Sequence, residues 1–288
     1  MPSTPKALID QNLRLFSLPE IALRLTEMVE DPACSVVQIG EEIARDPGLS
    51  ARLLRVVNSP VYGFPSEIDS IPMAITILGT RQLRDLVLAT SVFQAFGKAD
   101  NSEQDMEVFW VHSITCALAA REIANELRLG YGERLFVAGL LHDIGKLVML
   151  STLRHEYREL MTRLQDSPAS SHGSLEREIF GFDHSDIGSE LLGRWNLPES
   201  LIEPVRCHHA PHKARQFRPD SYIVHLANHL ANIISPLISR DDAPMLAPET
   251  LATLTLDEDG LEAVMARTRE KQPVVVEVLY PEARTAAG

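Results

Sequence analysis

Apolar residues recur at helical spacing along almost the whole chain, and this periodicity constrains the fold more than any other feature. Residues 17–20, Ser-Leu-Pro-Glu, have the pattern of a helix capping box, and Ser35 with Gln38 repeats it. Asp46-Pro47 supplies a further N-cap with a first-turn proline. No convincing alternating strand pattern occurs before Pro273, whereas residues 274–278 fit either a short strand or an extended arm. The sequence therefore predicts an all-α fold.

The polar stretch at residues 97–105 is the clearest break in this helical pattern. We place a domain junction there, which gives an N-terminal helical module at residues 1–100 and a second helical half at residues 101–240. We expect residues 241–288 to form a C-terminal extension that is partly helical and frayed from Pro281 onward. The expected architecture is thus a helical bundle in two parts.

Charge and composition narrow the classes of function. The net charge of −13 argues against direct nucleic-acid binding, which relies on clustered Lys and Arg, so any role in gene expression would run through a protein partner. Three widely spaced cysteines, an odd number, speak against a disulfide framework. The N-terminus lacks the apolar core of a signal peptide, and the unbroken apolar runs are too short to span a bilayer. We expect a cytoplasmic protein without a membrane segment.

Several histidines and one aspartate lie where separate helices could assemble a buried metal centre: His112, His142, Asp143, His184, His208 and His209. Imidazole and carboxylate are ligands that first-row divalent metals accept, and a carboxylate beside a histidine can bridge two ions. The His142-Asp143 pair interrupts an apolar helical run, where two buried polar side chains are costly without a purpose. Alone, His112 or His184 would more often be a hydrogen-bonded surface or core histidine, so both assignments depend on this pair.

This arrangement resembles the HD superfamily of metal-dependent phosphohydrolases, in which motifs on successive helices supply the ligands. His112 corresponds to the first ligand, and His142-Asp143 to the doublet that names the superfamily. His184 fits the next motif, and His208-His209 fit the paired histidines that follow it. The resemblance implies that these side chains bind metal, two ions being possible.

Three further positions decide how far the resemblance extends. Lys146 matches the lysine that contacts substrate phosphate in the related HD-GYP phosphodiesterases. The last metal ligand should be an aspartate, and the best match here is Asn228. The Gly-Tyr-Pro element is missing, because residues 210–213 read Ala-Pro-His-Lys. The two departures argue against a cyclic-dinucleotide phosphodiesterase.

The N-terminal third resembles the HDOD proteins, in which a helical module precedes a divergent HD-like half. The resemblance covers roughly residues 15–235 and rests on ordered matches: Leu18-Pro19, Asp46-Pro47-Gly48-Leu49, the run Arg-Leu-Leu-Arg-Val-Val-Asn-Ser at residues 52–59, Tyr62-Gly63 and Leu78-Gly79. It implies an HDOD-type module packed on an HD-domain-like half. HDOD proteins are bacterial signalling or regulatory proteins, usually described as lacking catalytic activity.

Two classes of function therefore stay open. In the first, the chain is a regulatory module that binds a divalent transition metal (iron, manganese or zinc) or a nucleotide in a degenerate site and acts through a signalling protein partner. In the second, it is a working phosphohydrolase in which Asp143 and Lys146 are catalytic. Asn228 favours the first class, since an amide in place of a carboxylate removes one negative charge from the cation site.

Overall fold

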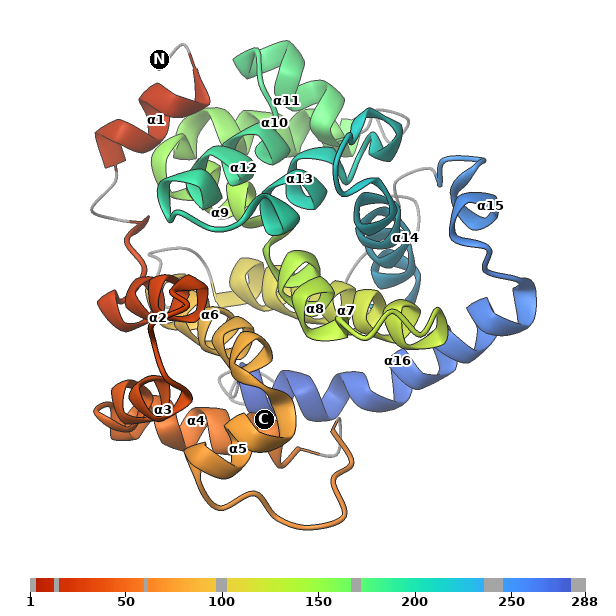
Figure 1. The fold of residues 1–288 in the computed structure, drawn as a ribbon. Coiled ribbons are helices and arrows are strands. Elements are labelled where there is room, and N and C mark those ends of the chain that lie inside the picture. The colour runs from red at the N-terminus through yellow and green to blue at the C-terminus, as the bar shows by residue number, and fades with distance from the viewer. Residues whose placement is uncertain are drawn as a thin grey trace. The chain divides into compact units, whose positions relative to one another are not determined.

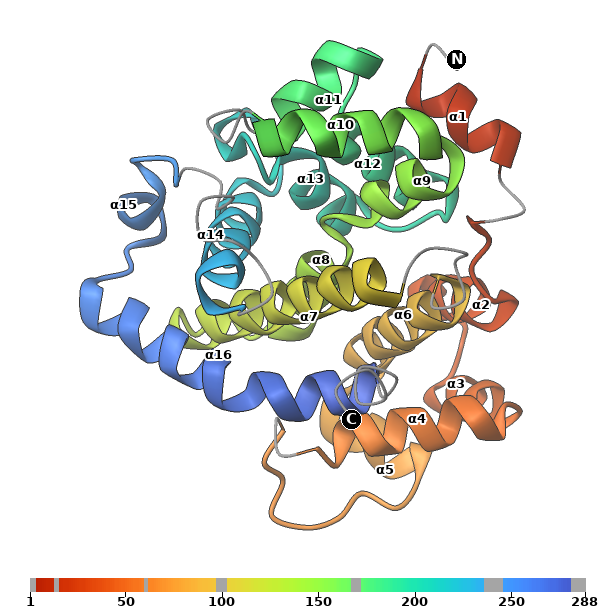
Figure 2. The ribbon, with the colours of Figure 1, turned by 180° about the vertical axis from the view of Figure 1, so that it is seen from behind.

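The computed structural model describes residues 4–12, 16–59, 62–96, 103–166, 172–235 and 246–280 (Figures 1 and 2). Within these ranges the regular elements are helices and no residue forms a strand, which confirms the all-α prediction. The chain divides into two compact units. The N-terminal unit comprises Leu18–Lys98 with Arg269–Gly288, and the central unit comprises Met1–Ser17 with Ala99–Thr268. Each unit thus combines two separate stretches of the chain. From its sequence, the chain is instead expected to divide into three consecutive segments.

The N-terminal unit is built from short helices and the end of a long one: α2 (Glu20–Glu30), α3 (Val36–Ala44), α4 (Pro47–Val57), α5 (Ile71–Leu78), α6 (Thr80–Phe96) and the last part of α16 (Glu258–Leu279). Ser35 and Gln38 form the predicted capping box of α3, and Asp46 caps α4 ahead of Pro47. The capping box predicted at residues 17–20 is wrong. Helix α2 begins after Pro19, which leaves Ser17 two positions before the N-cap, where it does not cap the helix.

The central unit holds the predicted ligands. Its helices are α1 (Pro5–Asn12), α7 (Glu103–Glu126), α8 (Gly132–Leu141), α9 (Ile144–Thr152), α10 (Arg154–Asp166), α11 (His172–Phe180), α12 (His184–Arg194), α13 (Glu199–Cys207), α14 (Arg218–Ile234), α15 (Thr250–Leu254) and the first part of α16. Helix α7 packs against α8 and α14, while α12 packs against α9 and α13 (Figures 1 and 2).

Two glycines permit the close helix contacts on which this arrangement depends. A Cβ at Gly139 of α8 would lie 2.9 Å from the backbone of Ala117 in α7. A Cβ at Gly145 of α9 would collide with the carbonyl oxygen of His184 at the start of α12. Both positions therefore need glycine, since any side chain would push the helices apart. Gly145 in this way brings the aspartate two residues before it close to His184.

Residues 274–278 are helical, so the predicted strand or extended arm is wrong. They continue α16, which contains Pro273 in its interior. The β-branched residues there favour a strand locally, but Val275 and Leu279 are buried one helical turn apart. Tertiary burial therefore overrides the local preference.

By length and composition alone, the segment Gly132–Thr152, formed by α8 and α9, is long and apolar enough to cross a membrane. The sequence-based expectation considers only unbroken apolar runs, which are shorter than this segment. Within its test window, however, 78% of the segment is buried inside the protein. The His142-Asp143 pair also separates the two helices, since Leu141 ends α8 and Ile144 begins α9. The segment is accordingly core of the central unit.

Candidate metal centre

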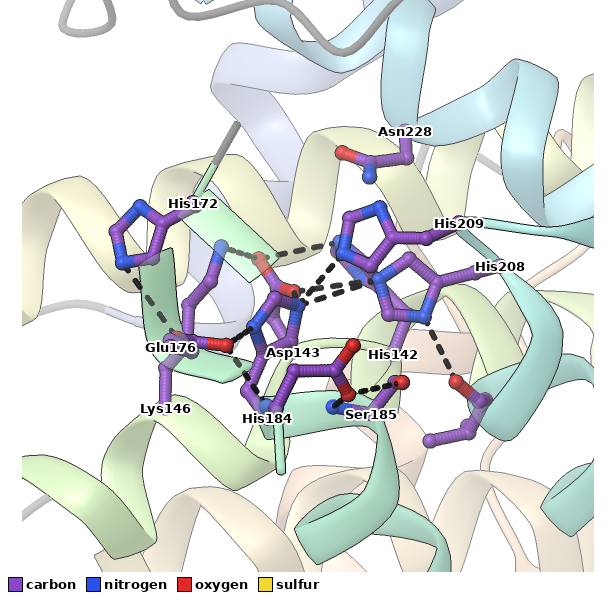
Figure 3. Close-up of polar contacts among 12 residues, drawn as sticks. His142, Asp143, Lys146, His172, Glu176, His184, Ser185, His208, His209 and Asn228 are labelled. Atoms are coloured by element: carbon purple, nitrogen blue, oxygen red, sulfur yellow. Dashed lines mark hydrogen bonds and ion pairs between the residues drawn. The ribbon is translucent and has the colours of Figure 1, made fainter. Parts of the chain in front are cut away.

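Six of the predicted ligands converge from helices far apart in the sequence. Figure 3 labels five of them, all except His112. His112 lies within α7, and His142 and Asp143 form the junction between α8 and α9. His184 is the first residue of α12, and His208 with His209 follows the end of α13. All except His209 are buried in the central unit. Helix ends thus supply every residue of the cluster except His112.

Asp143 lies at the centre of the cluster, and its two carboxylate oxygens face different neighbours. Oδ2 lies 3.3 Å from His142 Nε2 and 3.6 Å from His112 Nε2. Oδ1 lies 3.1 Å from His184 Nε2 and 3.7 Å from His208 Nε2. When His184 is neutral, as a metal ligand must be, Oδ1 is buried and accepts no hydrogen bond from the described residues. A buried carboxylate oxygen without a hydrogen bond is costly, and a bound cation would satisfy it.

The imidazoles form two groups around this carboxylate. The first imidazole group is His112 and His142, whose Nε2 atoms lie 3.3 Å apart. The second imidazole group is His184, His208 and His209, in which His184 Nε2 lies 3.4 Å from His208 Nε2 and 2.8 Å from His209 Nε2. In each group the possible ligand atoms lie within 4.8 Å of one another, Asp143 being counted with the first group. Each of the two groups could therefore hold a metal ion, and Asp143 lies between them.

The outward nitrogens of three rings are fixed by hydrogen bonds. His142 Nδ1 lies 2.7 Å from the carbonyl oxygen of Gly139, and His208 Nδ1 lies 2.7 Å from that of Val205. A carbonyl oxygen can only accept, so each Nδ1 must donate, and in the neutral ring the Nε2 lone pair then faces the centre. Outer partners that fix the tautomer in this way are typical of metal-ligating histidines.

His184 uses a different outer partner because it begins its helix and has no preceding helical carbonyl. Glu176 of α11 takes that role, with Oε2 lying 2.5 Å from His184 Nδ1 and accepting the His184 backbone N–H at 2.8 Å. The Glu176 side chain is fully buried. Its other oxygen lies 3.6 Å from His172 Nε2, which in turn lies 3.3 Å from the Tyr157 hydroxyl. No sequence pattern marks Glu176, because no spacing rule predicts a glutamate eight residues before a predicted ligand.

Burial and neighbouring charges set the protonation of the cluster. Burial disfavours the charged ring of His142, but the Asp143 carboxylate outweighs it and raises the pKa of His142 to about 10. At His184 burial is likewise outweighed, by Glu176 and Asp143, and the pKa rises to about 9. Burial and the charge of His142 instead lower the pKa of His112 to about 3. A metal would replace the bound protons, because ligating imidazoles must be neutral.

Lys146 and Asn228 both lie beside the first imidazole group. Lys146 Nζ donates to Asp143 Oδ2 at 2.6 Å and is thus the counter-ion of the same oxygen that faces His112 and His142. Asn228 is buried in α14, close to the imidazole of His112. Its Oδ1 also accepts a hydrogen bond from Asn232 Nδ2 at 3.1 Å. The structure therefore places Asn228 at the edge of the cluster, with its amide oxygen already engaged.

Comparison with known proteins agrees with this fold. The sequence profile of the HDOD domain matches residues 15–211. An uncharacterized protein of Treponema pallidum is 26% identical over 227 residues, and the uncharacterized protein YuxH of Bacillus subtilis is 24% identical over 198 residues. These matches cover 75% and 68% of this chain but only 42% and 41% of those proteins. The chain thus corresponds to less than half the length of either relative.

Solved structures of other proteins share this fold. A Shewanella amazonensis protein, provisionally named a phosphohydrolase, superposes with a TM-score of 0.74 at 25% identity, covering 94% of this chain and 97% of that one. An HDOD domain protein of unknown function from Geobacter sulfurreducens gives 0.67 at 23% identity, covering 96% and 97%. A Marinobacter aquaeolei protein, provisionally named a signal transduction protein, gives 0.73 at 18% identity, covering 97% and 61%. Because the profile match spans more than half of its residues, this chain belongs to the HDOD domain family.

Proposed function

We propose that this chain is a regulatory HDOD module that holds two transition-metal ions in a degenerate HD centre and acts through a protein partner in the cytoplasm. The observation that carries the proposal is the geometry of Asp143. Its two oxygens face two separate imidazole groups, and Oδ1 has no hydrogen bond from the described residues when His184 is neutral. A single carboxylate between two nitrogen-rich groups is how a binuclear site is built.

The donor set favours particular metals. Five imidazoles and one carboxylate suit iron, manganese or zinc, whereas magnesium and calcium prefer oxygen ligands. The first imidazole group would hold one ion with Asp143 Oδ2, and the second would hold another with Asp143 Oδ1. Such ions would polarise a bound ligand or water. Lys146 and Asn228 would belong to the first ion's surroundings.

Two departures from the HD pattern in the sequence support regulation rather than turnover. Asn228 supplies a neutral amide where the HD pattern has a carboxylate, and residues 210–213 lack the Gly-Tyr-Pro element. The net charge of −13 makes a protein partner a better candidate than nucleic acid. The alternative function is a metal-dependent phosphohydrolase acting on a nucleotide, with Asp143 holding the ions and Lys146 contacting phosphate. It is favoured by the retained ligands and by the Shewanella amazonensis likeness.

Elemental analysis tests the metal proposal. The full chain should be purified without a metal-affinity tag and should carry about two ions per chain after loading with iron, manganese or zinc. The melting temperature should rise on loading, because an ion that binds only the folded state stabilises it. Absence of bound metal, together with an unchanged melting temperature after each ion is added, would refute the proposal.

Turnover is tested with a cyclic dinucleotide. We expect metal-loaded protein to leave it intact, because the Gly-Tyr-Pro element is missing and Asn228 replaces the last carboxylate. Linearisation by wild-type protein, abolished in Asp143→Ala, would instead make the chain an enzyme. Linearisation that persists in Asp143→Ala would come from a contaminant and would leave the regulatory proposal in place.

A further inference from the structure

A cleft of about 410 Å³ opens beside the second imidazole group. His209 lines it, and the same side chain has its Nε2 2.8 Å from His184 Nε2 in the cluster. His209 is also the only ligand candidate among the described residues that is not buried. The cleft is therefore the place where a molecule from solvent can reach the second group.

The acidic side chains that line the cleft are already engaged. Asp183 accepts the backbone N–H groups of Ser185 and Asp186 at the start of α12 and pairs with Arg177 at 2.8 Å. Asp186 accepts the Asp183 backbone N–H at 3.1 Å and also pairs with Arg177, at 3.0 Å. Glu203 accepts three backbone N–H groups, from Arg215 at 2.9 Å, from Gln216 at 2.9 Å and from Phe217. These carboxylates therefore have little capacity left to attract a cation into the cleft.

The cations of the cleft are less fully neutralised. Arg206 pairs with Glu199 at 3.0 Å, but Lys213 and Arg215 form no ion pair with any described residue. Both line the cleft, in a protein whose net charge is −13. Two basic side chains without an ion pair at one cleft favour an anionic ligand over a cation there.

The segment that carries Lys213 and Arg215 is held in place by hydrogen bonds to Glu203. We call residues 213–217 the Glu203 loop, because the buried carboxylate of Glu203 in α13 binds three successive backbone N–H groups in it. Burial alone would raise the pKa of Glu203, but these hydrogen bonds outweigh it and lower that pKa, so the carboxylate stays charged. The loop is thus pre-organised, which reduces the entropy lost when a ligand binds.

We propose that this cleft is a phosphate-binding site for a small phosphorylated molecule, with Lys213 and Arg215 recognising the phosphate where the cleft opens onto the second imidazole group. Guanidinium and ammonium groups are the usual phosphate ligands of proteins. The cleft volume of about 410 Å³ lies near the lower end of the range for small-molecule sites, which suits a mononucleotide better than a cyclic dinucleotide. The phosphate contact itself does not rest on the proposed metal function, although any contact of the ligand with an ion does.

The test measures adenosine monophosphate binding by isothermal titration calorimetry with the full chain, both chelator-treated and manganese-loaded. Lys213→Ala/Arg215→Ala should weaken binding at least about tenfold in both forms, because two charge-assisted hydrogen-bond donors are lost. The control is Arg55→Ala/Arg158→Ala, which makes the same change in net charge at exposed positions outside the cleft and should change the affinity by less than about twofold. Adenosine should bind much more weakly than its monophosphate.

Equal losses in the two double variants, or equal affinity for adenosine and its monophosphate, would overturn the proposal. Glu203→Gln keeps both cations but loosens the loop, so it should weaken binding while the far-ultraviolet circular dichroism stays unchanged. Unchanged affinity in Glu203→Gln would refute the role given to the loop. Binding in the chelator-treated form separates the two hypotheses, since the phosphate site can be present even if the protein proves to bind no metal.

Discussion

The first and second imidazole groups share Asp143 but are supported in opposite ways. The first, His112 and His142, has a cation and an amide beside it, namely Lys146 at 2.6 Å from Asp143 Oδ2 and Asn228 at His112. The second has three imidazoles and a buried carboxylate, Glu176, behind His184. Positive charge repels a metal ion and outer-sphere negative charge attracts one. We therefore expect the second group to bind its ion more tightly.

Removal of the shared carboxylate should abolish this difference, with the largest effect of all. Asp143→Ala takes a charged ligand from both groups at once, so metal affinity should fall at each by more than the roughly 100-fold that loss of an outer partner costs. Elemental analysis of the loaded protein should then find almost no metal. Retention of one ion per chain would show that one group binds without Asp143 and that the carboxylate is not a bridge.

Removal of Glu176 should affect the second group alone. Glu176→Gln keeps the shape of the side chain but loses its charge, so it accepts a weaker hydrogen bond from His184 Nδ1. The metal affinity of the second group should therefore fall about 10–100-fold. A metal titration should lose its tighter step and keep the weaker one. Glu178→Gln is the matched control, because Glu178 is exposed on the same helix and pairs with Arg163. Equal weakening of both steps would refute the assignment.

The clustering of these side chains could be predicted from the sequence, because a motif fixes residue types at set positions, whereas metal binding stays a prediction. His142-Asp143 interrupts an apolar run, and its position between α8 and α9 explains why two polar residues occur there. The all-α fold was predictable from helical periodicity and from caps such as Ser35 and Asp46. These signals are local, and each is determined within a few residues.

The parts that could not be predicted depend on contacts between distant segments. Glu176 gains its role only because α11 places it behind His184, and an isolated glutamate gives no sign of that. Asn232 likewise engages Asn228 through the register of α14. The Glu203 loop depends on three backbone N–H groups that no side-chain pattern reveals. The strand prediction for residues 274–278 is wrong for a related reason, because burial along α16 overrides their local strand preference.

Restoration of the missing carboxylate should strengthen the first group. Asn228→Asp adds a negative charge beside His112 without changing the shape of the side chain, and Asn232 Nδ2 can still donate to it. Affinity at the first group should rise about tenfold, which corresponds to about 1.4 kcal/mol. Melting curves with and without manganese measure the change, and the gain should appear only with the ion. A variant that melts below wild type under both conditions would mean that Asn228 is structural, since an unpaired buried charge is destabilising.

Removal of the lysine should have the smallest effect, and its sign depends on whether metal is bound. Without metal, Lys146 is the hydrogen-bonded cation of Asp143 Oδ2, so Lys146→Met should lower the melting temperature. With metal, the ion supplies that positive charge, and the ammonium instead repels it. The variant should then bind the first ion about three- to fivefold more tightly, a modest change because Lys146 is partly exposed and its charge is screened. Lys6→Met is the control, since Lys6 is exposed on α1. An equal loss of stability with and without metal would show that Lys146 supports the fold alone and that no cation competes with it at Asp143.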